Sequence, residues 1–374
     1  MPEHSRLPRS PLPNEVLVLG GYGNFGKRIA RGLNRHGVPV VVAGRDADKA
    51  AALAAELGAR SLAFDVRHDL PDVLRRERPS VVVHTAGPFQ GADYGVARAC
   101  IAAGVAYVDL ADGRDFVRDF AVLDAEAKAA GVTLVSGAST VPGLSSAVIE
   151  HLRPAFSRLD AIDFGISPGQ RTERGLATFR AILSYAGRRL RPFPGRAAPF
   201  GWLDLHSQVY PVFGRRWLSA CDIPDLDLLP AAYGFKAIRF GAGIEVAPLM
   251  FVMAALAWLI KAGLPLDLPR LAPLLKGATD LFNPFGSDTG GMHVTLTGED
   301  HEGRPLETRW FIVAGNGDGP QIPCVPGILL AKRLHEKDPG LGTDVLVPGA
   351  FACVGLIKLE DYLAELKPYA VTTY

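Results

Sequence analysis

The sequence predicts an α/β protein in which a doubly wound parallel sheet is followed by a second, α+β domain with a mostly antiparallel or mixed sheet. Three observations support this prediction. Short aliphatic runs alternate with segments of helical periodicity as far as Pro142, glycines follow four of the helical segments, and alternation of apolar and polar side chains dominates after Pro142. The length of 374 residues suits about two domains.

The first part of the chain has the pattern of repeated strand–helix units. Its predicted strands are apolar on both faces, as in a parallel sheet that helices cover on both sides. These strands are 16–19, 38–43, 61–65, 80–85, 106–110 and 133–136. The helices predicted between them are 25–35, 47–57, 69–77, 92–103 and 116–130. Four of these helices end at a glycine, where a left-handed residue commonly terminates a helix: Gly37, Gly58, Gly104 and Gly131.

The second part of the chain has the two-residue period of antiparallel strands. Ile162, Phe164 and Ile166 alternate with polar or small residues. Two further strand pairs flank short turns, 208–212 with 216–221 and 293–297 with 307–313. We therefore divide the chain into a loose tail, a first domain, a second domain, and a C-terminal segment that packs back on the first domain: 1–14, 15–142, 143–315 and 316–374.

Composition excludes several classes of protein. The chain has 40 basic and 39 acidic residues without a long run of one sign, so a nucleic-acid partner is not expected. The four cysteines are far apart, which disfavours a disulfide framework and fits a reducing cytoplasm. No ligand spacing typical of a metal site occurs, and the tail lacks the apolar core of a secretory signal.

One uncharged apolar segment covers residues 246–260. It contains Pro248, is followed by Lys261, and is shorter than the roughly 20 residues that a membrane-spanning helix needs. We expect a buried helix here. Contact with a membrane surface, or with a second copy of the chain, is the alternative.

The strongest motif lies where the first strand passes into the first helix. Gly21, Gly23 and Gly26 form a G-x-G-x-x-G pattern in this strand–helix context. The first glycine allows the tight turn, the second lets a pyrophosphate approach the backbone, and the third lets the helix pack on the sheet. The helix N-terminus then presents amides to the phosphates. This predicts a Rossmann domain whose cofactor contacts are Gly21, Tyr22, Gly23, Asn24, Phe25 and Gly26.

The residue after the second strand predicts which dinucleotide binds. NAD-binding units usually carry Asp or Glu near this place to hold the ribose hydroxyls. Here Arg45 follows the strand, and a guanidinium suits the 2′-phosphate of NADP. We therefore expect NADP(H). In the alternative interpretation Arg45 is a surface residue, and Asp46 binds the ribose or caps the next helix.

Two further strand ends point to the same crevice, because ligands lie beyond the carboxyl ends of parallel strands. Asp65 and Val66 follow the third strand and are expected beside the adenine. Ala86, Gly87 and Pro88 follow the fourth and would let a ribose lie against the backbone. They would also make sense as plain loop residues.

At this point the sequence resembles a known family, the saccharopine dehydrogenase-like NADP-binding proteins. The resemblance covers about the first 150 residues and continues loosely at 319–323. It is carried by GGYGNFG at 20–26, AGR at 43–45, TAGPF at 85–89, AYVDL at 106–110 and GASTVPG at 137–143. It implies a Rossmann domain joined to a mixed-sheet domain, often in a homodimer, and nicotinamide-dependent oxidation or reduction of a small molecule.

The second domain lacks the features that binding of saccharopine would need. We cannot match a set of its basic residues to those that would hold the carboxylates of saccharopine, and the 246–260 segment is unlike a site for a polar amino acid. An apolar or amphipathic substrate is therefore expected. Arg174 and Arg180 are candidates to hold an anionic group, and Ser139 to hydrogen-bond substrate. The alternatives are ion pairs for the arginines and a helix cap for Ser139.

Tyr107 and Asp109, at the end of the fifth strand with Asp112 just after, are candidate catalytic residues. A tyrosine hydroxyl can relay a proton, and a carboxyl group can donate one when burial raises its pKa. A core aromatic and a turn cap are the alternatives. We predict hydride transfer to or from a C=N, C=O or C=C bond. A non-catalytic NADP-binding sensor or scaffold, and a peripheral lipid-associated protein, are the rival functions.

Overall fold

The computed structural model describes residues 14–336 and 347–374, so nearly all of the predicted tail lies outside the described residues. The first sheet has seven parallel strands in the order β13-β6-β5-β4-β1-β2-β3. These strands are β1 (Val16–Leu19), β2 (Val40–Gly44), β3 (Arg60–Ala63), β4 (Val81–His84), β5 (Ala106–Asp109), β6 (Thr133–Ser136) and β13 (Gly349–Ala352). The order reverses between β1 and β4, which places a crevice for a ligand beyond these two strands.

Helices cover both faces of this sheet, as the alternation predicted. They are α1 (Gly26–Arg35), α2 (Ala47–Leu57), α3 (Leu70–Glu77), α4 (Gly95–Ala103), α5 (Arg114–Arg118) and α6 (Asp124–Ala130). The prediction of one helix over 116–130 was wrong, because a 3₁₀ turn at Asp119–Leu123 separates α5 from α6. The glycine ends are confirmed: Gly58, Gly104 and Gly131 adopt the left-handed conformation after their helices.

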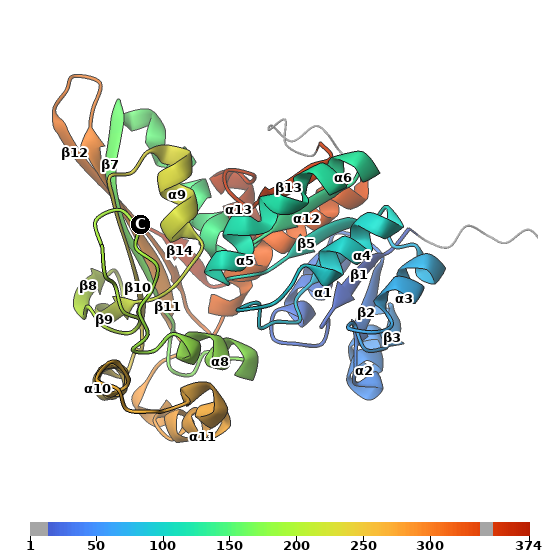
Figure 1. Cartoon of the computed structure of the whole chain (residues 1–374), viewed down its shortest axis with the longest axis horizontal. Helices are drawn as coiled ribbons and strands as arrows, with labels where there is room; N and C mark the ends of the chain where they lie inside the picture. The colour runs from blue at the N-terminus through green and yellow to red at the C-terminus, as the bar shows by residue number, and fades with distance from the viewer. Residues whose placement is uncertain (1–13, 337–346) are drawn as a thin grey trace, which may run out of the picture.

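The second sheet is mixed, which confirms the predicted fold class. Its order is β14-β12-β11-β7-β10-β9-β8, and β7 pairs parallel with β10 and antiparallel with β11. The strands are β7 (Arg158–Ser167), β8 (His206–Tyr210), β9 (Gly214–Ala220), β10 (Ala237–Gly243), β11 (Gly290–Glu299), β12 (Pro305–Ala314) and β14 (Val371–Thr373). The helices around it are α7 (Ser145–Leu152), α8 (Leu176–Ser184), α9 (Asp225–Tyr233), α10 (Ala247–Lys261) and α11 (Leu268–Asp280). Figure 1 shows this sheet beside the first domain, with α10 and α11 at its lower end.

The C-terminal segment contributes a strand to each sheet. After the 3₁₀ turn Gly319–Cys324, α12 (Val325–Glu336) packs against α1, and Ile328 occupies the space that Gly32 leaves open. β13 then pairs with β6, and β14 pairs with β12 after α13 (Leu359–Leu366). The two domains are thus joined by more than the single crossing near Pro142.

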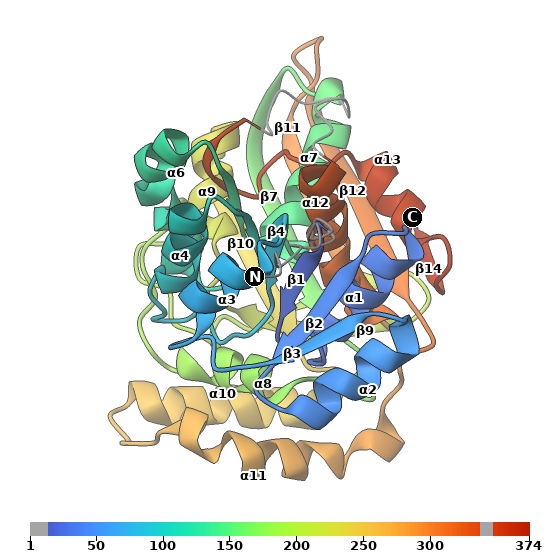
Figure 2. The ribbon, with the colours of Figure 1, turned by 90° about the vertical axis from the view of Figure 1, so that its right-hand side faces the viewer.

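The apolar segment that sequence analysis expected to be buried is only half buried. In α10, Met250, Met253 and Ala257 are buried, whereas Phe251 is 45% and Trp258 61% exposed. The helix lies along one end of the molecule next to α11 (Figure 2), and its outer side is largely exposed, although the ring of Phe251 contacts that of Trp217. No helix in the described part of the chain is both long and apolar enough to span a membrane.

Candidate active site

The loop between β1 and α1, residues 20–26, lies at the point where the strand order of the first sheet reverses, and we call it the glycine loop. The amide of Gly23 donates to the carbonyl of Gly20 at 2.8 Å, and the amide of Gly21 donates to that of Ala43 at 2.9 Å. A Cβ at Gly26 would lie 2.2 Å from the Gly20 oxygen, so the close packing of α1 on the loop requires glycine. No side chain caps the N-terminus of α1. The amides of Lys27 and Arg28 already donate to the carbonyls of Gly23 and Phe25, whereas those of Asn24, Phe25 and Gly26 make no hydrogen bond within the described residues. These three amides and the positive dipole end of α1 are therefore available to a phosphate.

The loop after β4 closes one side of the glycine loop. Thr85 Oγ1 donates to the carbonyl of Leu19 at 2.8 Å, and a Cβ at Gly20 would lie 3.0 Å from this hydroxyl. Ala86 and Pro88, which follow Thr85 in this loop, are exposed. The sequence predicts cofactor contacts at 86–88 but does not single out Thr85, because a threonine after a strand carries no distinctive signal.

The loop after β2 leaves one guanidinium without a partner. Asp46 caps α2 by accepting from the Lys49 amide, and its carboxylate pairs with Lys49 Nζ at 2.8 Å. The Tyr22 hydroxyl accepts from the Asp46 amide at 3.0 Å. Arg45 is exposed and makes no hydrogen bond or ion pair with the residues described. The helix cap foreseen for Asp46 is therefore present, and Arg45 stays available to a ligand.

The loop after β3 lies on the same edge of the sheet. Asp65 and Val66 are partly buried, and Asp65 Oδ1 accepts from the Arg67 amide at 3.0 Å. The structure thus brings the predicted cofactor residues of four strand ends to one edge. Among the residues described, no group of three or more metal-ligating side chains is placed to hold a metal ion.

A cavity of about 450 Å³ adjoins the glycine loop and extends between the two domains. Phe25 of the loop lines it, together with apolar side chains from α8, α10, α11 and the second sheet. Apolar side chains make up most of its lining, and the polar ones come from both domains. Those contributed by the first domain and the crossing to the second domain are Gln90, Asp112, Ser139 and Thr140.

Asp112 is the carboxyl group of the first domain that faces this cavity. Its Oδ1 accepts from Gln90 Nε2 at 3.0 Å, and burial raises its pKa above the ordinary range. Tyr185 of the second domain also lines the cavity, and burial holds its pKa well above the usual value, with smaller contributions from Cys221 and Asp112. Asp112 follows a strand end, a signal that sequence analysis noted without assigning it a role.

Tyr107 and Asp109 do not line the cavity. Tyr107 is 1% exposed and packs in the core beside Phe120, with its hydroxyl 3.1 Å from His84 Nδ1. Asp109 Oδ1 accepts from the Ala111 amide, the Gly137 amide and Ser136 Oγ at 2.8–2.9 Å. Burial raises the pKa of Asp109 to about 6. This carboxyl group therefore fixes the two loops that follow β5 and β6. A turn cap of this kind was the alternative to a catalytic role for Asp109.

The three predicted substrate residues lie in different surroundings. Ser139 faces the cavity, and its side chain makes no cap for the following helical turn. Arg174 lines this cavity and a second one of about 380 Å³ next to it. Arg180 is exposed on α8 and lines neither.

Comparison with known proteins identifies the first domain. Residues 16–135 match the family model described as the saccharopine dehydrogenase NADP binding domain. The first domain is a saccharopine dehydrogenase-like NADP-binding domain. The match confirms the family that the motifs resemble and NADP(H) as the cofactor, whereas the role of Arg45 stays a prediction.

Solved structures resemble the chain beyond its NADP-binding domain. Apo saccharopine dehydrogenase (L-Glu forming) from Saccharomyces cerevisiae matches with a TM-score of 0.64 and 16% identity over 96% of this chain and 100% of that chain. An amine dehydrogenase from Mycobacterium smegmatis matches with a TM-score of 0.44 and 13% identity over 91% and 95%. The first likeness shows that the fold is shared across both domains. No curated protein sequence matches the chain.

The NADP-binding domain has the shape that a pyrophosphate requires. A Cβ at Gly23 would contact one protein atom, the Gly20 oxygen at 3.0 Å, so the space in front of this glycine is otherwise open. Because α1 is uncapped beside this space, the loop offers both room and hydrogen-bond donors to a phosphate. The residues present therefore fit the cofactor.

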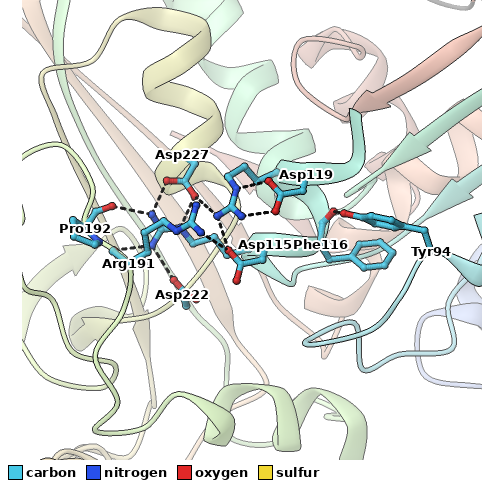
Figure 3. A network of polar contacts seen from close by, with 10 residues as sticks. Tyr94, Asp115, Phe116, Asp119, Arg191, Pro192, Asp222 and Asp227 are labelled. Atoms are coloured by element: carbon cyan, nitrogen blue, oxygen red, sulfur yellow. Dashed lines mark hydrogen bonds and ion pairs between the residues drawn. The ribbon is translucent and has the colours of Figure 1, made fainter. Parts of the chain in front are cut away.

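A buried network of charges joins the NADP-binding domain to the second domain (Figure 3). Arg114 is 3% exposed and donates to both carboxylate oxygens of Asp227, to Asp222 Oδ1 and to the Arg191 carbonyl at 2.7–3.0 Å. Arg118 adds ion pairs to Asp227 and to acidic residues of its own helical segment. Asp222 also lines the cavity, so this network fixes one wall of the site.

Proposed function

We propose that the protein is an NADP(H)-dependent oxidoreductase that transfers hydride to or from a C=N, C=O or C=C bond of a small molecule. The observation that carries this proposal is the cavity of about 450 Å³ that begins at Phe25 of the glycine loop. Its volume lies within the range of about 300–1,000 Å³ typical of small-molecule sites. A sensor that only bound NADP would need no such space beside the cofactor, so the cavity favours an enzyme.

We assign the cofactor contacts to the glycine loop and to the ends of β2, β3 and β4. The amides around Gly23 would hold the pyrophosphate, and Arg45 the 2′-phosphate. Asp65 and Val66 would flank the adenine, and Gly87 would lie against a ribose. NADPH, when bound, supplies the hydride.

The chain itself would bind, orient and protonate the substrate. Asp112 is our candidate for the proton donor, because it faces the cavity and its raised pKa keeps its proton to higher pH than an ordinary carboxyl group. Ser139 would hydrogen-bond the substrate next to it. Asp109 acts as a positioning residue, since its carboxylate holds the loops that carry Ala111 and Gly137. The apolar walls would exclude water from the reacting atoms.

The proposal is tested by following NADPH consumption with three sets of apolar compounds. The first set contains imines, the second contains carbonyl compounds and the third contains enoyl compounds. We expect turnover of one set and almost none by the Asp112→Asn variant at unchanged NADPH affinity. A folded chain that binds NADPH and turns over none of the three sets would instead be the sensor or scaffold.

Contact with a lipid surface is a second candidate function. It is favoured by the exposed apolar side chains of α10: Phe251, Val252, Trp258 and Leu259. Flotation with liposomes of phosphatidylcholine and phosphatidylglycerol tests it. A chain with Trp258→Ser and Phe251→Ser should float less than the natural chain. If the natural chain stays at the bottom of the gradient, this candidate is excluded.

A further inference from the structure

Arg174 is a partly buried cation without a carboxylate partner among the described residues. One of its terminal nitrogens donates to the backbone carbonyl of Gln170 at 2.6 Å, and no ion pair within the described ranges includes it. Burial lowers its pKa, because water is removed from a charge that nearby carboxylates compensate only in part. A guanidinium has five donors, so most of those on Arg174 are available to a ligand.

The carboxylates around Arg174 already pair with other cations, Glu245 among them with Arg216 at 2.8 Å. The second cavity, of about 380 Å³, is lined by Arg174, Glu173, Lys276 and Asp280 among other residues. Lys276 pairs with Asp280 at 2.8 Å. Glu173 pairs with Lys27 and Arg28 of the NADP-binding domain. The exposed Arg171 also lines this cavity, which therefore carries an excess of positive charge.

The cationic cavity and the apolar one adjoin each other. Both are lined by Thr172, Glu173, Arg174, Phe179 and Thr279. Beyond this shared boundary the larger cavity is walled by apolar side chains of α10, of α11 and of the turn after α11, among them Met253, Leu256, Leu275 and Phe282. A ligand that crossed the boundary would meet a positive charge in one cavity and hydrocarbon in the other.

We propose that the substrate is an anionic amphiphile, with an apolar body in the larger cavity and a carboxylate or phosphate group bound by Arg174. The inference rests on the proposed function for the reaction itself, but the binding site can be tested without turnover. A guanidinium holds both oxyanions through paired hydrogen bonds. Because each buried CH₂ strengthens binding about fourfold, a longer apolar chain should bind more tightly until the cavity is full.

The test is calorimetric titration of the NADPH-saturated chain with hexanoate, decanoate, decyl phosphate and decan-1-ol. We expect decanoate and decyl phosphate to bind at least tenfold more tightly than hexanoate and than decan-1-ol. Arg174→Gln should weaken the two anions at least tenfold and leave decan-1-ol unchanged. Arg270→Gln is the matched control, since Arg270 lies on α11 but lines neither cavity and should bind all four as the natural chain does.

Two further measurements keep the inference apart from the proposed function. Ala181→Leu, which fills part of the larger cavity, should weaken decanoate at unchanged NADPH affinity. If Arg174→Gln weakens NADPH and leaves the anions unaffected, Arg174 serves the dinucleotide and the inference is wrong. If decanoate binds no more tightly than hexanoate, the inference is also wrong. Failure of turnover with intact, Arg174-dependent decanoate binding would refute only the proposed function.

Discussion

Arg45 is the residue on which the choice of dinucleotide depends. Its exposed guanidinium lies just beyond β2, while the neighbouring Asp46 is engaged in capping α2 and pairing with Lys49. We predict that Arg45→Ala weakens NADPH about 10–100-fold, because charged hydrogen bonds contribute roughly 1.5–3 kcal/mol. NADH, which lacks the 2′-phosphate, should change little. Calorimetric titration of both nucleotides measures this, and equal losses would refute the role of Arg45.

Asp112 is expected to set the pH dependence of catalysis. Burial raises its pKa, so the proton-donating form should persist to higher pH than in an ordinary carboxyl group and be lost as the pH rises through that value. In the reductive direction kcat should therefore fall on the alkaline side. Asp112→Asn should reduce kcat by about 10²–10⁴-fold and remove this descending limb. A variant that keeps both the limb and most of the rate would assign it to another group.

The cavity adjoins the loop after β5 but not the two side chains of that strand that the sequence singled out, whose catalytic role stays a prediction. Tyr107 and Asp109 lie two residues apart on the same face of β5 and are buried, whereas Asp112, in the loop beyond, faces the cavity. Strand periodicity shows which residues share a face but not which face the site adjoins, because that depends on where the second domain lies. The cofactor loop needed no such information, since its glycines are required by local backbone geometry.

At the scale of the elements, the contact between α5 and α9 fixes the position of the two domains relative to each other. Arg114, buried at the start of α5, reaches Asp227 of α9 and Asp222. We predict that Arg114→Ala lowers the free energy of unfolding by about 3 kcal/mol, because it leaves the partly buried Asp222 without its cation and Asp227 with Arg118 alone. Arg191→Ala removes an exposed pair at the edge of this network and should cost about 0–1 kcal/mol. Urea unfolding would measure both, and equal effects would contradict this account.

Sequence patterns predicted an element best where its burial leaves a clear pattern of apolar residues. The strands β1 to β6 of the first sheet were predicted within a few residues, because buried parallel strands are apolar throughout, whereas β13 was not predicted as a strand. The helix over 116–130 was predicted too long, since nothing in its periodicity marks the turn at Asp119–Leu123. In α10 the residues are apolar all round, so the sequence did not reveal that Trp258 faces outward.

At the scale of the whole molecule, the site arises from two domains that share their C-terminal segment. β13 extends the first sheet and β14 the second, and the cavity lies between the domains that these strands complete. Sequence analysis predicted two domains and their order, but the cavity combines residues as distant as Phe25 and Pro323. Such long-range placement has no local sequence signal. The homodimer and the cytoplasmic location stay predictions.

The account depends most on a dinucleotide seated between β1 and α1. Titration of NADPH into the full chain and into Gly23→Val, with unfolding followed in parallel, tests this directly. A Cβ at Gly23 would approach one backbone oxygen, so the variant should fold, while its side chain would occupy the space of the pyrophosphate. We predict saturable NADPH binding by the natural chain and none by the variant. Equal affinity in both, or no affinity in a folded natural chain, would contradict the account.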